Sequence, residues 1–277
     1  MVNQLNITTP SFDEDFKLLL TKNRDTENDV TGVVKEILKN VRDSGNQAVF
    51  DYTEKFDHLS LNEDNMRVSE QEINQAIIDS EPETIDALKI AAKRINDFHI
   101  RHLPEDDNMT DAEGVELSVR WNAVSAAGIY VPGGKAVYPS SVLMNAIPAK
   151  AAGVERIIMV VPAPNGYLNP LVLAAANISG IDEIYKIGGA QAIGALAYGT
   201  ETIKPIDVIA GPGNAYVAAA KKEVFGTVGI DMIAGPSEIL VVSDNKNDPA
   251  WIAIDLLSQA EHDEVAQSIL ITDDSAY

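Results

Sequence analysis

One segment restricts the possible folds of this chain more than any other: Ile206-Asp-Val-Ile-Ala-Gly-Pro-Gly-Asn-Ala-Tyr-Val-Ala-Ala-Ala-Lys221. A short apolar run, a Gly-Pro-Gly turn and an Ala-rich run predict a strand, a tight turn and a helix. Gly211 and Gly213 permit backbone angles or close approaches that a side chain would prevent. The turn also leaves free backbone N–H groups at the start of a helix, where they can bind an anion. We therefore expect a ligand-facing loop, in which Asn214 either caps the helix or directs its amide to a ligand.

Two more glycine turns follow apolar runs, in Gly128-Ile-Tyr-Val-Pro-Gly-Gly-Lys135 and in Ile184-Tyr-Lys-Ile-Gly-Gly-Ala-Gln191. Strand-like and helix-like runs alternate through this region, which predicts a parallel sheet with helices on both faces. Three glycine turns after such strands indicate one crevice with ligand-facing loops. The expected strands are 129–131, 156–161, 183–187, 206–210 and 238–242, and the expected helices are 141–152, 171–178, 190–198 and 215–224.

The first part of the chain reads as helical, beginning with an N-terminal arm over 1–24. Apolar spacing predicts one helix over 30–42, which ends near Gly45, and another over 48–56. Two more helices are expected, one after the capping pair Ser69 and Glu72 and one from Pro82 onward. His99 and His102 continue the apolar stripe of that last helix, so we interpret them as packing residues or as helix C-terminal charges rather than as a metal pair.

The segments between and after these helices also carry local signals. Residues 104–114 read as an acidic loop, and the alternation from Val115 to Trp121 predicts a half-buried strand. Near the other end of the chain, Asp248-Pro249 predicts a helix start, and 267–272 reads as a strand.

Composition excludes several classes of protein and site. The 277 residues carry a formal net charge of -21, which argues against binding to nucleic acid or to an anionic membrane surface. Cysteine is absent, so the sequence has no disulfide, no thiolate zinc site and no thiol nucleophile. Neither a signal peptide nor an apolar run of about 20 residues is present, and we expect a cytoplasmic protein.

The possible nucleotide and metal motifs are each incomplete. Gly211 and Gly213 begin a dinucleotide fingerprint, but Tyr216 stands at its third glycine position, and Asp231 lies near the expected place of a ribose-binding acid. Gln259 and His262 are three residues apart and share a helix face, which allows a metal site. A catalytic zinc site needs about three protein ligands, so this pair is insufficient, and a lone histidine at a helix end is more often structural.

Five motifs together resemble histidinol dehydrogenase, in the family's order and most strongly from Gly128 to His262. They are Gly128-Ile-Tyr-Val-Pro-Gly-Gly, Ile187-Gly-Gly-Ala-Gln-Ala-Ile-Gly, Ala210-Gly-Pro-Gly-Asn, Asp231-Met-Ile-Ala-Gly-Pro-Ser-Glu and Leu256-Leu-Ser-Gln-Ala-Glu-His. The resemblance implies oxidation of L-histidinol through the aldehyde to L-histidine, the last steps of histidine biosynthesis, with two NAD+ and a zinc ion.

The resemblance also implies a role for individual residues. Tyr130, Gln191 and Asn214 match the family's NAD contacts. Ser237 matches a substrate contact, and Gln259 and His262 match two zinc ligands that also touch substrate.

The implied fold is α/β, with two related, incomplete Rossmann-like domains, mostly parallel sheets, flanking helices and an N-terminal helical arm. The expected division is an arm over 1–24, a first domain of 25–127 plus 238–277, and a second domain over 128–237. In this implied fold the cofactor is not held through a full glycine motif, which agrees with the break in the standard fingerprint at Tyr216.

The family's catalytic base, a Glu-His dipeptide, and its remaining zinc ligands, an aspartate and a histidine, are expected beyond Tyr277. No catalytic base is therefore assigned here, and we expect a truncated form that is inactive alone and whose family homodimer is weakened. A non-catalytic binding or scaffold protein with the same fold is the alternative. An aldehyde dehydrogenase that uses a thiol is disfavoured by the absence of cysteine.

Overall fold

The structure is a computed structural model that describes residues 3–22, 27–133, 138–233, 235, 237–261, 266–275 and 277. It divides into two compact units, Met1–Ile233 and Ala234–Tyr277. Each unit contains its own parallel sheet. The grouping of 25–127 with 238–277 into one domain stays a prediction.

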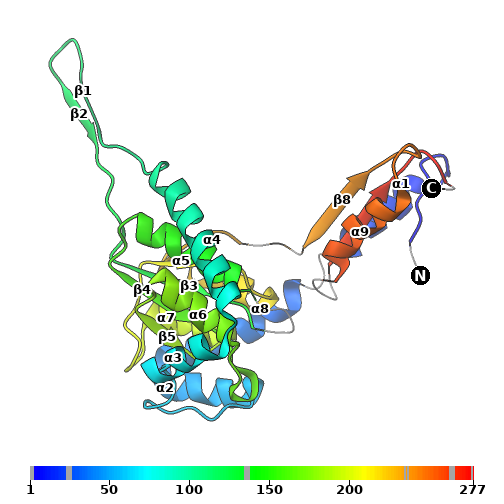
Figure 1. Cartoon of the computed structure of the whole chain (residues 1–277). Coiled ribbons are helices and arrows are strands. Elements are labelled where there is room, and N and C mark those ends of the chain that lie inside the picture. Colours follow the sequence, from blue (N-terminus) through cyan, green and yellow to red (C-terminus); the bar gives the residue numbers. More distant parts are fainter. Residues whose placement is uncertain are drawn as a thin grey trace. The chain divides into compact units, whose positions relative to one another are not determined.

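The first unit is built on a five-stranded parallel sheet with the strand order β5-β4-β3-β6-β7 (Figure 1). Because β3 lies in the middle and the following strands add on either side of it, the chain reverses direction across the sheet between β3 and β6. This arrangement confirms the predicted parallel α/β fold. The strands are β3 (Ala126–Tyr130), β4 (Arg156–Val160), β5 (Glu183–Tyr185), β6 (Val208–Ala210) and β7 (Gly229–Ile230).

Helices cover both faces of this sheet, as the alternating sequence predicts. The connecting helices are α5 (Pro139–Ala151), α6 (Pro170–Ser179), α7 (Gly189–Tyr198) and α8 (Ala215–Val224), and a 3-10 turn, η1 (Pro164–Gly166), precedes α6. Side chains of β3 alternate between two cores: Ile129 packs with residues of α5 and α6, and Tyr130 packs with residues of α7 and α8. All five residues of β3 are buried, as expected for a central parallel strand.

Three helices before the sheet pack on its two helical layers (Figure 1). They are α2 (Glu27–Asp57), α3 (Glu70–Asp79) and α4 (Pro82–Ile100), and α1 (Phe12–Lys22) precedes them in the chain. α2 packs against α7 and α8, α3 packs against α6, and α4 packs against α5 and α6. Gly45, with φ 51° and ψ -128°, bends α2 where the sequence predicts a helix end, and Ser69 with Glu72 forms the predicted capping box of α3.

The segment between α4 and β3 corrects two predictions. The predicted acidic loop contains β1 (Asp107–Thr110), which pairs antiparallel with β2 (Glu116–Val119). The prediction of a half-buried strand was wrong about burial, because every residue of both strands is exposed. Leu117 and Val119 are each 52% exposed. Alternation specified the strand, but burial requires a second layer over it, and the described residues supply none at this hairpin.

The second unit has a two-stranded parallel sheet, β8 (Glu238–Val242) and β9 (Gln267–Ile271), with α9 (Pro249–Ala260) packed on it. Asp248 caps α9 by accepting a hydrogen bond from the Ala250 N–H at 2.9 Å, which confirms the Asp-Pro start signal. Within the ranges that the structure describes, no helix combines the length and hydropathy needed to cross a lipid bilayer.

Candidate functional site

The three glycine turns follow strands β3, β5 and β6 of the first unit, at the carboxyl edge of its sheet. Gly211 brings the turn after β6 into contact with the end of β3. Its φ is +116°, and a Cβ atom added there would lie 2.1 Å from the backbone oxygen of Tyr130. Only glycine allows this approach, so the turn after β6 is set against the last residue of β3. The edge lies at the reversal point of the sheet, where α/β folds bind ligands.

Tyr130 connects the end of β3 to the turn after β5. Its hydroxyl oxygen accepts a hydrogen bond from the Gly189 N–H at 3.1 Å. The side chain is almost fully buried, and this burial raises the pKa of Tyr130 to about 12, so the phenol stays protonated at neutral pH. The structure thus places the hydroxyl of one predicted cofactor contact against the first turn of the helix that carries another, Gln191.

Gln191 has an unusual environment for an amide side chain. It lies in the first turn of α7 and is 1% exposed, and its Oε1 atom is buried without a hydrogen-bond partner among the described residues. A Cβ atom on Gly189 would lie 2.7 Å from this oxygen, so the missing side chain leaves room for it. A buried acceptor without a donor costs roughly 1–3 kcal/mol. A ligand N–H or O–H group would remove that cost.

Asp57, which the sequence analysis did not identify, is a second buried acceptor of this kind. It is the last residue of α2, and its Oδ2 atom is buried with no hydrogen-bond partner in the described part of the chain. Burial raises the pKa of Asp57. The charge of Asp57 also contributes to the raised pKa of Tyr130, although burial of Tyr130 is the larger cause. Asp57 ends a polar sequence with no motif, so no sequence signal distinguished it.

Asn214 adopts the first of its two predicted roles. It is the N-cap of α8, and its Oδ1 accepts a hydrogen bond from the Val217 N–H at 3.1 Å. The cap uses the oxygen of the amide, which leaves the NH2 group as the donor that can serve a ligand. Asn214 is exposed, so a ligand can reach this group.

Asp231, whose spacing suggested a ribose-binding role, is bonded to the turn after β6. Its Oδ2 accepts a hydrogen bond from the Gly211 N–H at 2.8 Å, and its Oδ1 accepts one from the Lys221 ammonium. Both carboxylate oxygens are therefore used to hold the turn after β6. No sequence pattern singled out Lys221, whose buried ammonium also donates to the Gly211 carbonyl oxygen at 3.0 Å.

The remaining predicted site residues belong to the second unit. Gln259 is half-buried in the last turn of α9. The Ser237 carbonyl oxygen accepts a hydrogen bond from the Gln267 N–H at 3.0 Å, just before β8. His262 lies outside the described residues. Over the described ranges, no group of three or more His, Asp or Glu side chains could hold a metal ion, so the metal pair stays a prediction.

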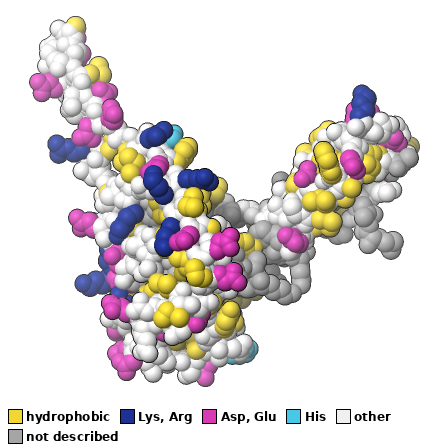
Figure 2. Space-filling view, in the orientation of Figure 1, with side chains coloured by type: hydrophobic (Ala, Val, Ile, Leu, Met, Phe, Trp, Pro, Cys, Tyr) yellow, Lys and Arg dark blue, Asp and Glu magenta, His cyan; other side chains and the backbone are white. Residues whose placement is uncertain are grey.

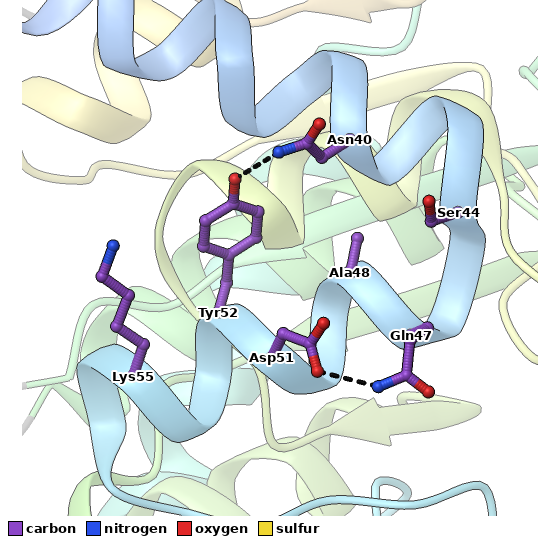
Figure 3. Close-up of a pocket in the computed structure, with 7 residues that line it drawn as sticks. All are labelled: Asn40, Ser44, Gln47, Ala48, Asp51, Tyr52 and Lys55. Carbon is purple, nitrogen blue, oxygen red and sulfur yellow. Dashed lines mark hydrogen bonds between the residues drawn. The ribbon is translucent and has the colours of Figure 1, made fainter.

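Two other features of the first unit do not contribute to this edge. His102 lies just after α4, where its Nδ1 is 2.7 Å from the Phe98 carbonyl oxygen and its ring lies against the Phe98 ring. A hollow at the bend of α2 is lined by residues of that helix alone (Figure 3). Among the lining residues, Asn40 donates a hydrogen bond to the Tyr52 hydroxyl, and Gln47 donates one to Asp51. None of the predicted site residues lines this hollow.

Comparison with known proteins gives one consistent result. A family model described as histidinol dehydrogenase matches residues 20–277. Histidinol dehydrogenase of Rhodospirillum rubrum is 61% identical over 274 residues, which are 99% of this chain and 63% of that protein. The enzyme of Brucella suis is 58% identical over 277 residues, which are 100% of this chain and 64% of that protein.

A solved structure agrees with these relatives. The crystal structure of histidinol dehydrogenase from Elizabethkingia anophelis matches with a TM-score of 0.80 at 42% identity, over 88% of this chain and 57% of that one. The matches thus cover 57% to 64% of the length of these relatives.

Proposed function

The chain belongs to the histidinol dehydrogenase family, and on this premise we propose that it supplies the cofactor-binding loops and part of the metal site of an enzyme that oxidises L-histidinol to L-histidine. The alcohol loses a hydride and a proton to give the aldehyde, and the hydrated aldehyde loses a second hydride and proton to give the acid. NAD+ accepts each hydride when it is bound.

The buried, unpartnered oxygen of Gln191 is the observation that carries the cofactor proposal. Polar groups are rarely left in this state unless a ligand or water completes them. Tyr130 ends β3 beside the turn that leads to Gln191, and Asn214 begins α8 at the same edge of the sheet, so we place the dinucleotide at these three residues. Gln191 accepts a hydrogen bond from it, the Asn214 NH2 group donates one, and the buried Tyr130 holds the Gly189 N–H of the neighbouring turn. Asp57 Oδ2 is a further acceptor for this ligand.

The metal and substrate part of the proposal depends on family membership and on the chemistry of two side chains. The Gln259 amide oxygen and a His262 imidazole nitrogen are suitable zinc ligands, and zinc would orient the imidazole and amine of histidinol. The described residues do not by themselves form a metal site. Ser237 is placed as a substrate hydrogen-bonding residue.

The absence of cysteine agrees with this chemistry. Many enzymes oxidise aldehydes through a covalent thiol adduct, and that route is closed to these 277 residues. A hydrate can donate the hydride instead if a base removes its proton. We place that base, together with the remaining zinc ligands, in the part of the relatives' length that this chain does not match.

Three further features belong to the same proposal. The working enzyme is a cytoplasmic homodimer. Its first Rossmann-like domain combines 25–127 with 238–277, its second is 128–237, and residues 1–24 form an N-terminal arm. These 277 residues alone bind NAD+ without turning over histidinol. A non-catalytic protein with this fold would also bind NAD+ without turning over histidinol. The activity assay below separates such a protein from part of an enzyme.

Calorimetric titration of the 277-residue chain with NAD+ tests the cofactor site. We expect saturable binding, and we expect Gln191→Ala to weaken it about tenfold because one hydrogen bond to the ligand is lost. The matched control is Gln47→Ala, an exposed glutamine at the hollow of α2, which should bind like the unaltered chain. Absence of binding at millimolar NAD+ would refute the proposed cofactor site.

A second assay follows NADH formation with L-histidinol as substrate and added zinc. We expect no turnover by the 277-residue chain and turnover by a chain extended with the corresponding residues of the Rhodospirillum rubrum protein. Activity of the shorter chain would disprove the placement of the base. An inactive extended chain that still binds NAD+ would favour the non-catalytic alternative.

A further inference from the structure

Buried Lys221 and partly exposed Asp231 form an ion pair that contacts the Gly-Pro-Gly turn of the first unit. The Lys221 side chain is 4% exposed and that of Asp231 is 31% exposed. The Lys221 ammonium donates to the Asp231 Oδ1 and to the Gly211 carbonyl oxygen, the latter at 3.0 Å. The Asp231 Oδ2 accepts from the Gly211 N–H at 2.8 Å. One ion pair thus holds both backbone polar groups of a single residue.

The helix and the sheet together explain how the two side chains reach this residue. Asn214, Val217 and Lys221 are separated by three and four positions, so they share one face of α8. Side chains on a helix tilt toward its N-terminus, and this directs the Lys221 ammonium back toward the turn. Asp231 directly follows β7, and its N–H donates to the Ile209 carbonyl oxygen at 3.0 Å, which places it beside the end of β6.

Stability alone does not account for a pair of this type. Removing the Lys221 charge from water is costly, and an ion pair that includes a buried charge often adds little net stability. The pair instead fixes a conformation. Gly211 lies at φ +116°, and the position that a Cβ atom would take lies against the Tyr130 carbonyl oxygen. The Gly211 N–H and C=O groups would otherwise require other partners. Three residues later, Asn214 begins α8.

We infer that Lys221 and Asp231 are positioning residues for the cofactor: they hold the Gly211–Asn214 turn so that the Asn214 amide and the turn amides face the dinucleotide. This inference rests on the proposed NAD function of the same turn. Neither residue need touch the cofactor. Their role is to preorganise the groups that do, which removes an ordering cost that binding would otherwise carry.

The test measures NADH affinity of the 277-residue chain by nicotinamide fluorescence. Lys221→Met is the main variant, because it leaves Asp231 with its Gly211 bond and buries no unpaired cation. Asp231→Asn is the second variant. We expect each to weaken NADH binding about ten- to hundredfold, because the turn must then be ordered when the ligand binds. If the pair acts as one unit, Lys221→Met combined with Asp231→Asn binds no more weakly than the worse single variant.

Asp207→Asn is the matched control. The Asp207 Oδ2 accepts a hydrogen bond from the Ala126 N–H at 2.8 Å, so it joins β6 to β3 by the same kind of bond at the opposite, amino edge of the sheet. This variant loses a bond between strands and should lower the thermal midpoint, but it should bind NADH like the unaltered chain. Hydrogen exchange at the Gly211 amide should accelerate in Asp231→Asn and stay unchanged in Asp207→Asn.

The outcomes separate the inference from the function on which it rests. If the unaltered chain binds NADH and Lys221→Met binds it within twofold, the positioning role is wrong and the cofactor site stands. If Asp207→Asn weakens binding as much as Lys221→Met, the effect is one of general stability and the inference also fails. If the unaltered chain does not bind NADH, the proposed cofactor site fails and the positioning role fails with it.

Discussion

The two units use the same local elements but differ in how completely they bury them. In the first, all five residues of β3 are buried, and helices cover both faces of the sheet. In the second, β8 alternates between half-buried and exposed residues, and α9 contains no buried residue. Figure 2 shows hydrophobic side chains on the visible face of the second unit, and Trp251 is 73% exposed. A strand or helix is specified locally, whereas its burial depends on the number of layers packed around it.

This difference also separates the two parts of the candidate site. Tyr130 and Gln191 are fixed by burial and by contacts with glycine turns. Gln259 is carried by a helix with one covered face in a unit of few layers. The proposed cofactor loop on the first unit is thus preorganised by its core, whereas the proposed metal ligand on the second depends on the stability of a much smaller packed structure.

The largest expected effect comes from truncating one leucine in a helix of each unit. Leu196 in α7 is 0% exposed and Leu257 in α9 is 62% exposed. Leu196→Ala should lower the free energy of unfolding by about 2–5 kcal/mol, because it removes buried methyl groups and leaves a cavity. Leu257→Ala should change it by less than about 0.5 kcal/mol. Urea unfolding followed by circular dichroism measures both, and equal losses would contradict the contrast in burial.

The next effect tests the close approach at Gly211 within the first unit. Gly211→Ala places a Cβ atom against the Tyr130 backbone oxygen at positive φ, and we expect the free energy of unfolding to fall by about 3 kcal/mol. Gly226 also has positive φ, +97°, but no atom lies within 4 Å of an added Cβ. Gly226→Ala should therefore lower the free energy of unfolding only by the cost of holding alanine at positive φ, about 1 kcal/mol. Thermal unfolding compares them, and similar midpoints for the two variants would show that the approach is easily relieved.

A third effect concerns acid sensitivity. Burial alone would raise the pKa of Glu183, but hydrogen bonds from Arg156 and Tyr185 outweigh it and hold this pKa below the usual 4.5. A carboxylate with a lowered folded-state pKa stabilises the protein above pH 4.5, and that contribution is lost as the pH falls through the folded-state value. The unaltered chain should therefore lose stability on acidification below this pH.

Glu183→Gln removes the contribution at every pH, so its stability should be lower by about 1–2 kcal/mol at pH 7 and should fall less on acidification. Glu238 is the control, because it is also the first residue of a parallel strand but is exposed in the second unit. Glu238→Gln should change stability by less than about 0.5 kcal/mol at pH 7. Unfolding midpoints measured from pH 3 to 7 give these values, and parallel pH curves for Glu183→Gln and the unaltered chain would disprove the role of the Arg156 bond.

The sequence predicted features that local chemistry determines. The Gly-Pro-Gly turn and the Ala-rich run located α8 at Ala215–Val224, and Asp248-Pro249 located the start of α9. The hairpin was predicted incorrectly because the alternation from Val115 to Trp121 does not encode whether another layer covers it. β7 was missed because two residues are too short to show a pattern.

The candidate site was predictable in part for the same reason. Tyr130, Gln191 and Asn214 stand in recognisable motifs beside glycine turns, and the structure brings Tyr130 into contact with the turn that leads to Gln191. No motif links Lys221 to Asp231, because ten residues separate them and only the fold brings their side chains together. Buried acceptors such as Asp57 Oδ2 become visible only after the fold defines what surrounds them.

The smallest effect tests the two faces of the second sheet. Val241 is half-buried and lies on the face toward which α9 packs, whereas Leu240 is 57% exposed on the other face. Val241→Ser should destabilise the second unit by about 1 kcal/mol through lost burial of an apolar side chain. Leu240→Ser should leave its stability within about 0.5 kcal/mol of the unaltered chain, because a residue already in water loses little when it becomes polar. Hydrogen exchange of the β8 and β9 amides measures opening of this unit alone. Equal acceleration in the two variants would show that both faces of β8 are buried in solution, and the contrast between the units would then no longer hold.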